Sequence, residues 1–206
     1  MTDTLSTTSE LSAVNTIISM VGKSPLNSLS NLTDVEAITA QSILLEVTRE
    51  VQTKGHSFNT EACMTLSRDL STNKISVPLN TAMFRPSPIG GNADDKLVER
   101  GGFVYDVTNE TFVFTADVEA ELVLLYTFDK LPQYARQYIM IRAGRIFQDR
   151  QRVSETRHRF TIVDERDAQM AFTKNETRVK AHQRNLKRGG GYIAETIHRR
   201  RFLGRQ

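Results

Sequence analysis

Residues 33–55, with the sequence TDVEAITAQSILLEVTREVQTKG, form the stretch that decides the fold class. Apolar side chains recur along it at alternating intervals of three and four residues, which places them on one face of an α-helix. Thr33 and Glu36 have the spacing of a capping box, in which each side chain satisfies a backbone N–H at the start of a helix. We therefore predict a helix over residues 33–54 that stops at Gly55 and packs against other helices. Its apolar face consists of Ala37, Ala40, Leu44, Val47 and Val51.

A second helix is predicted over residues 10–21, on the N-terminal side of this stretch. Ser9 has a side chain that is preferred at a helix N-cap, and Gly22 stands where a left-handed residue commonly ends a helix. This position of Gly22 also explains the sequence Gly22-Lys23-Ser24, because a phosphate-binding loop would need a glycine where Ile17 stands. The apolar face of this helix consists of Leu11, Val14, Ile17, Ile18 and Val21.

A third helix is predicted over residues 132–152. Pro132 suits its first position, because a proline there loses no helical hydrogen bond and already has a helical φ. One apolar face contains Ala135, Ile139, Ala143 and Ile146, joined by Tyr138 and Phe147. Five arginines are expected to lie largely off this face, and they are Arg136, Arg142, Arg145, Arg150 and Arg152.

The periodicity changes between residues 58 and 127, where short alternating runs are separated by Pro, Gly and Asn. Residues 103–105 and 111–114 have the pattern of two strands with a turn at residues 107–110 between them, which predicts a β-hairpin. Further strands are predicted over residues 83–85, 96–98 and 120–126. The middle of the chain is therefore expected to form a small, mainly antiparallel β region.

The segment of residues 164–188 has high helix propensity but few apolar anchors. A helix this polar takes its burial from a partner or from the rest of its own fold. Gly189-Gly190-Gly191 ends the segment, and a tail with isolated apolar residues and the cationic cluster Arg199-Arg200-Arg201 follows. The apolar anchors of the predicted helix are Met170, Phe172, Val179 and Leu186.

These patterns together predict an α+β fold, in which a helical bundle carries an inserted small antiparallel β region and an extended C-terminal arm. Residues 1–57 are expected to supply the N-terminal helices of the bundle, and residues 58–130 the inserted β platform. Residues 131–163 are expected to supply the third bundle helix. Residues 164–206 are expected to form a basic helix and arm.

The charges divide unevenly along the 206 residues, although the formal net charge is only +3. Residues 1–129 contain 8 basic and 17 acidic residues, a net charge of −9, whereas residues 130–206 contain 19 basic and 7 acidic residues, a net charge of +12. Such asymmetry indicates that the C-terminal part meets a partner. The alternative, that the acidic part simply covers the basic part, stays open at this point.

Composition disfavours several classes of protein. A single cysteine, Cys63, cannot form an intrachain disulfide framework, and a lone cysteine is usually a small buried hydrophobe. No apolar run reaches the roughly 20 residues that span a bilayer, and the first 20 residues lack the pattern of a secretory signal. We therefore expect an intracellular protein with no membrane partner. We also expect no metal or cofactor, because four histidines fall at no metal-ligand spacing: His56, His158, His182 and His198.

Two alternative functions stay open from the residues alone. Paired carboxylates can cleave a glycosidic bond, and Asp94 with Asp95, or Glu119 with Glu121, are the candidates for a cell-wall or capsule glycoside hydrolase. The basic tail can also bind nucleic acid through its phosphates. However, the tail lacks the aromatic pattern, zinc-finger spacing or clear recognition helix of a sequence-reading protein.

Four blocks of the sequence, in order along residues 10–150, carry a resemblance to a known family. The first is ELSAVN at residues 10–15 with the following Ile-Ile pair and the Gly22 cap. The second runs from Ile43 to Asn59, and His56 stands in it where an aromatic residue is usual. The third is RGGFVYD at residues 100–106, and the fourth is FDKLP at residues 128–132 with the arginine-rich helix through Phe147. Through these blocks the chain resembles tail tubular protein A, the adaptor or gatekeeper family of short-tailed, podovirus-type bacteriophages.

This resemblance implies a structural head-to-tail adaptor and not an enzyme. Members of that family form a twelve-subunit ring that joins the portal to the tail nozzle protein and surrounds the DNA exit channel, with tail fibres attached around the junction. The resemblance thus implies a location in the virion tail, and in the host cytoplasm during assembly. C-terminal segments of the family reach into the portal, and non-specific contact with DNA in the channel is a further expectation. The candidate portal-binding residues are Arg188, Tyr192, Ile193, Ile197, Arg199, Arg200, Arg201, Phe202 and Leu203.

Overall fold

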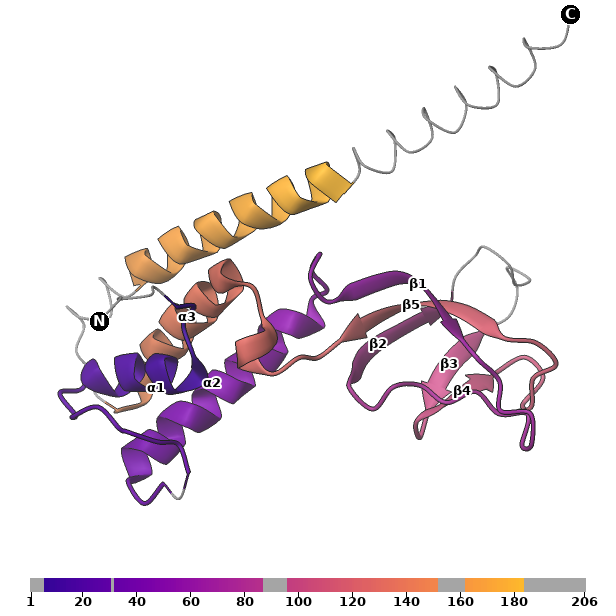
Figure 1. Ribbon diagram of the computed structural model, residues 1–206, viewed down its shortest axis with the longest axis horizontal. Helices are drawn as coiled ribbons and strands as arrows, with labels where there is room; N and C mark the ends of the chain where they lie inside the picture. Colours follow the sequence, from indigo (N-terminus) through magenta and orange to yellow (C-terminus); the bar gives the residue numbers. More distant parts are fainter. Residues whose placement is uncertain (1–5, 31, 87–95, 152–161, 184–206) are drawn as a thin grey trace, which may run out of the picture.

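The computed structural model describes residues 6–30, 32–86, 96–151 and 162–183. Three helices pack together at one end of the molecule, and the strands lie at the other end (Figure 1). A fourth helix, residues 162–183, runs along the bundle on the side of the third (Figure 1). This arrangement is the α+β architecture that the periodicities predict. The three labelled helices are α1 (Glu10–Ser19), α2 (Val35–Thr53) and α3 (Gln133–Gln151).

Helix α1 begins and ends through the predicted caps. The side chain of Ser9 accepts a hydrogen bond from the backbone N–H of Ser12, and Gly22 has a φ of +84°, the left-handed conformation expected of a terminating glycine. The helix is two residues shorter than predicted. Its last turn is tightened, because the N–H groups of Val21 and Gly22 bond to carbonyls three residues earlier instead of four.

The predicted N-cap of helix α2 is wrong, because the residue at that position is Asp34 and not Thr33. The carboxylate of Asp34 accepts a hydrogen bond from the backbone N–H of Glu36 at 3.1 Å. Glu36 does not complete a capping box, because its own carboxylate lies 3.3 Å from Nζ of Lys23. The helix therefore starts at Val35, two residues after the predicted start, while its predicted apolar face is buried as expected.

The helical core is built from the predicted faces of the three helices. Ala135, Ile139, Ala143 and Phe147 of α3 are fully buried against α1 and α2. Pro132 lies one residue before α3, and its carbonyl accepts the N–H groups of Ala135 and Arg136. Large side chains at this core include Ile17, Ile18, Ile43, Leu44, Phe128 and Leu131.

The β region contains a three-stranded antiparallel sheet of order β1-β5-β2 and a separate two-stranded sheet. Strand β5 is therefore central, and one face of the larger sheet packs on the small sheet through a second apolar core that includes Val104 and Leu122. The strands are β1 (Thr60–Leu66), β2 (Thr81–Pro86), β3 (Leu97–Arg100), β4 (Phe103–Asp106) and β5 (Val118–Leu124).

The predicted hairpin is wrong in its pairing. Strand β4 pairs with β3 across the turn at Gly101-Gly102, and not with residues 111–114. Both glycines have positive φ, so this dipeptide closes the tight turn that the sequence offers. Asp106 explains the error. Its carboxylate accepts hydrogen bonds from Thr108 and Asn109 and folds residues 107–110 into a turn, after which only a single bridge to Thr111 forms.

The bundle and the β region are joined by two buried amide side chains. Gln52 near the end of α2 accepts a hydrogen bond from the N–H of Tyr126 and donates one to the carbonyl of the same residue. Asn59 donates to the carbonyls of Gln52 and Leu124. Both amides are completely shielded from solvent. Because buried polar groups must find partners, these bonds fix where the sheet sits relative to α2.

Candidate docking site beside the fourth helix

The structure does not test the nine candidate portal-binding residues, because Arg188, Tyr192, Ile193, Ile197, Arg199, Arg200, Arg201, Phe202 and Leu203 all lie outside the described ranges. What the structure does describe is the helix of residues 162–183, from which that segment continues. The candidate site is therefore the surface that this helix forms with α3, together with the contacts that hold the helix in place.

The arginines of α3 are engaged inside the fold. Arg142 bonds to Glu50 of α2 at 2.8 Å and to Glu165 of the fourth helix at 2.5 Å. Arg145 also binds Glu165 and bonds to Asp149. Glu165 is only 9% exposed, so these contacts occur largely out of solvent. Of these carboxylates only Glu50 belongs to the acidic part of the chain, whereas Glu165 and Asp149 belong to the basic part itself. These two arginines of α3 are therefore paired largely by carboxylates from their own part of the chain.

Arg136 contradicts the expectation that the arginines lie off the apolar face, since it is only 9% exposed. Its guanidinium donates to the carbonyls of Leu131, Asp129 and Thr8. A planar group with five N–H donors can satisfy several carbonyls at one chain crossing. Arg136 therefore ties the segment before α1 to the start of α3.

The far part of the fourth helix is held by a buried carboxylate, Glu176. Its oxygens accept hydrogen bonds from the backbone N–H and hydroxyl of Ser57, both at 2.9 Å, and from the hydroxyl of Tyr134 at 2.6 Å. Burial alone would raise the pKa of Glu176, but these donors outweigh it, and the pKa is lowered. Glu176 therefore stays ionised as an anchor between the fourth helix, α3 and the segment after α2.

An aromatic cluster surrounds this anchor. Phe172 is 6% exposed. The centroid of its ring lies 4.8 Å from the ring centroid of His56 and 5.2 Å from that of Tyr138. Burial lowers the pKa of His56, although Glu176 opposes the shift from 3.8 Å. Burial and the bond to Glu176 raise the pKa of Tyr134 to about 12. His56 is thus a half-buried member of the aromatic cluster, and it is neutral near pH 7.

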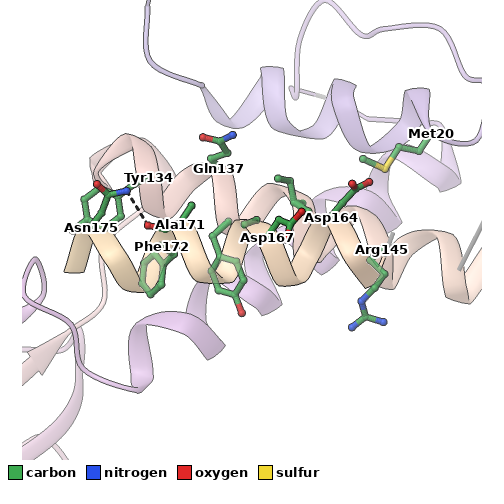
Figure 2. Close-up of a pocket in the computed structure, with 12 residues that line it drawn as sticks. Met20, Tyr134, Gln137, Arg145, Asp164, Asp167, Ala171, Phe172 and Asn175 are labelled. Carbon is green, nitrogen blue, oxygen red and sulfur yellow. Dashed lines mark hydrogen bonds between the residues drawn. The ribbon is translucent and has the colours of Figure 1, made fainter. Parts of the chain in front are cut away.

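A groove runs along the same helix beside the aromatic cluster, with which it shares Tyr134, Tyr138 and Phe172. It has a volume of about 420 Å³ and lies between α3, the fourth helix and Met20 after α1. Figure 2 shows Met20 and Asp164 at one end, and Tyr134 and Asn175 at the other. The lining is mainly apolar and includes Ile141, Ala168, Ala171 and Phe172. Two exposed carboxylates, Asp164 and Asp167, also line the groove.

Sequence reasoning missed the roles of Glu165 and Glu176, because acidic residues are rarely buried and were not counted as anchors. A signal was present, since Glu165, Ala168, Phe172, Glu176 and Val179 recur at intervals of three and four residues. These positions are buried or half-buried along the helix. Met170, a predicted anchor, is 55% exposed. The polar helix thus takes its burial from its own fold.

The other sequence candidates are dispersed. Glu121 pairs with Arg85 at 3.1 Å and Glu119 is exposed opposite Thr65, while Asp94 and Asp95 lie outside the described residues. Cys63 is exposed, which contradicts the expectation that it is buried. A register shift between Glu61 and Met64 takes it out of the regular strand.

Lys23 bonds to Asp34 and Glu36, which supports the helix-cap interpretation of Gly22-Lys23-Ser24. Of the other histidines, His182 is exposed, whereas His158 and His198 fall in ranges that the structure does not describe. Within the described part of the chain, no three His, Cys, Asp or Glu side chains gather as metal ligands would. None of the helices described there has the length and hydropathy needed to cross a bilayer.

Comparison with known proteins identifies the family of this chain. A search of curated proteins finds no match. The family model described as Tail tubular protein matches residues 11–182. This range includes α2, α3, both sheets and all residues that line the groove, and it omits only one terminal residue each of α1 and the fourth helix. This match covers the four blocks that carry the resemblance and extends through the helix of residues 162–183. The chain therefore belongs to the tail tubular protein family of bacteriophage tails.

Proposed function

We propose that this tail tubular protein is the head-to-tail adaptor of a short-tailed phage. In this role twelve copies form a ring that joins the portal to the tail nozzle protein and the fibres, and that surrounds the DNA exit channel. The observation that carries the proposal is the family match over residues 11–182, together with the order of the four sequence blocks. The role is structural and needs no catalytic step. It places the protein in the virion tail, and in the host cytoplasm during assembly.

Residues 1–57 and 131–163 would form the body of the adaptor, and residues 58–130 its platform toward the nozzle or fibres. The charge distribution supports a portal-binding role for the end of residues 164–206. Because Arg142 and Arg145 are paired within the fold, we assign the contact with a partner to basic residues further along the chain. Residues 184–206 contain seven basic residues and one acidic residue.

The chemistry of that segment suits a protein partner. Arginines such as Arg188 and Arg199 to Arg201 can bind carboxylates with two parallel hydrogen bonds. Tyr192 and Phe202 supply aromatic side chains, which carry much of the energy at protein interfaces. Ile193, Ile197 and Leu203 add apolar area. A portal with an acidic and apolar receptor surface is the partner that these side chains would bind.

The test is a binding experiment with portal-containing heads. We expect that a chain without residues 189–206 stays folded but no longer joins such heads, and that binding of the full chain weakens as salt rises. Normal affinity of the truncated chain would contradict the assignment of the segment. Binding to a DNA fragment at moderate salt without any portal would favour a nucleic-acid-binding protein. Turnover of capsule or peptidoglycan that is lost in Glu119→Gln or Asp94→Asn would favour a hydrolase.

A further inference from the structure

The groove beside the fourth helix lacks an occupant among the described residues, and its chemistry is specific. Its floor is apolar, from Ile141, Ala168 and Ala171. Asp164 and Asp167 stand exposed on the fourth helix beside this floor, and neither forms an ion pair with any described residue. An occupant that combines cationic and apolar side chains would bind here, because its charges would meet the two carboxylates while its apolar groups cover the floor.

The one cation among the lining residues does not oppose such an occupant. Arg145 is held by Glu165 and by Asp149, so its charge is already compensated within the described part of the chain. Figure 2 shows its guanidinium directed away from Asp164 and Asp167. Within the described ranges, the negative charge of Asp164 and Asp167 therefore has no compensating cation.

One segment of this chain has the required composition. Residues 199–203 read Arg-Arg-Arg-Phe-Leu, three cations followed directly by two large apolar side chains. They lie sixteen residues beyond Gln183, the last described residue of the fourth helix. Asp167 lies sixteen residues before Gln183, a distance of about 24 Å along a helix at 1.5 Å per residue.

The length of the intervening chain permits a return to the groove. Sixteen residues span up to about 50 Å when extended, which is twice the distance back from Gln183 to Asp167. Gly189-Gly190-Gly191 stand within this stretch, and glycine imposes the fewest restrictions on a reversal of chain direction.

We propose that residues 199–203 dock in the groove of their own chain before assembly. Arg199, Arg200 and Arg201 pair with Asp164 and Asp167, while Phe202 and Leu203 cover the apolar floor. If the proposed function holds, these are also residues that bind the portal. The docked state then holds them back until a portal competes for them, and the groove regulates the binding segment.

Disulfide trapping in the full chain tests this contact without a portal. In a Cys63→Ser background, cysteines replace Ala171, which lines the groove, and Gly204, which follows the docking residues. The matched control moves the first cysteine to Thr173, an exposed position on the opposite flank of the same helical turn. A disulfide requires Cα atoms within about 7 Å. Docking therefore favours only the first pair.

We expect the pair at positions 171 and 204 to form an intramolecular disulfide at least about tenfold faster than the control pair, at a rate independent of protein concentration. Equal rates for the two pairs would overturn the proposal. A disulfide-linked dimer as the main product would overturn docking within one chain in favour of docking on a second copy.

A charge variant tests the recognition itself. Asp164→Asn with Asp167→Asn keeps the size of both side chains and removes their charge. We expect this double variant to slow trapping of the pair at positions 171 and 204 to the rate of the control, with far-UV circular dichroism unchanged. An unchanged rate would overturn the charge pairing. Because no portal is present, failure of this contact is distinguishable from failure of the adaptor role.

Discussion

The hydroxyl of Tyr134 donates a 2.6 Å hydrogen bond to Oε1 of Glu176, across 42 residues of sequence. This bond links the start of α3 to the far part of the fourth helix. Ser57 donates to the same carboxylate, and Glu165 binds Arg142 and Arg145 nearer the beginning of that helix. A helix with few apolar anchors is therefore held at two points by buried acidic side chains.

Glu176→Gln tests the first of these anchors. The carboxylate of Glu176 accepts three hydrogen bonds. The amide of glutamine has only one acceptor oxygen, and its NH2 group would face some of the donors that now bind the carboxylate. Since hydrogen bonds to charged groups contribute about 1.5–3 kcal/mol, we expect the free energy of unfolding to fall by about 2 kcal/mol. Amide hydrogen exchange in residues 162–183 should rise more than exchange in α2. Glu61→Gln, at an exposed site on β1, is the matched control, and equal effects of the two variants would contradict the role of Glu176.

The stability of the fold should depend on pH through the same cluster. Both His56 and Glu176 have pKa values below their ordinary values of 6.5 and 4.5. The unfolded chain therefore binds more protons than the folded chain as pH falls, and stability is lost. The contribution of His56 is complete above pH 6.5 and declines below it, and that of Glu176 declines below pH 4.5.

His56→Phe separates the two contributions. Phenylalanine keeps an aromatic ring against Phe172 and does not titrate, so the decline just below pH 6.5 should become shallower, while the decline below pH 4.5 remains. Urea denaturation at a series of pH values measures both. An unchanged slope between pH 6.5 and pH 5 would show that His56 is not the titrating group.

The joint between the bundle and the β region rests on Gln52. Gln52→Leu keeps the volume of the side chain but leaves the N–H and the carbonyl of Tyr126 without this partner. Each buried polar group left unpaired costs about 1–3 kcal/mol, and we expect a loss of about 3 kcal/mol in thermal or urea unfolding. Gln41→Leu, which removes only one bond to Glu10 at a half-buried site, serves as the control. Similar losses for both would contradict a special role for the joint.

Two glycines should respond oppositely to alanine. Gly55 has a φ of +74°, and a Cβ there would lie 3.2 Å from Val123, so Gly55→Ala is expected to destabilise the fold by about 1–2 kcal/mol. Gly144 lies within α3, and its Cβ would meet only the flexible end of Met20 at closest approach. Gly144→Ala should raise stability by up to about 1 kcal/mol through helix propensity. Denaturation curves that reverse this order would contradict both assignments.

Much of the helical core follows from periodicity, because apolar spacing determines which face of a helix is buried. Leu44 in α2 and Ile139 in α3 lie where their repeats predict, and the Ser9 and Gly22 caps form as expected. Capping at α2 depends on a competition that the sequence pattern leaves undecided. Lys23 attracts Glu36, and Asp34 then caps the helix in place of Thr33.

The errors arise where tertiary contacts override local pattern. Burial of Arg136 depends on a chain crossing that brings the carbonyls of Thr8 and Asp129 together. The hairpin partner of β4 depends on a choice between two adjacent turns, and the sequence alone ranks them wrongly. The groove, likewise, exists only where α1, α3 and the fourth helix meet, so no motif predicted it.

We propose that this tail tubular protein closes into a ring on a portal, and its oligomeric state tests that proposal most directly. Purified protein is measured by native mass spectrometry and electron microscopy, first alone and then after mixing with portal. We expect a complex in which twelve copies sit on one portal, with the ring axis on the portal channel. A protein that forms no complex with the portal, or that binds with another fixed number of copies, would contradict it.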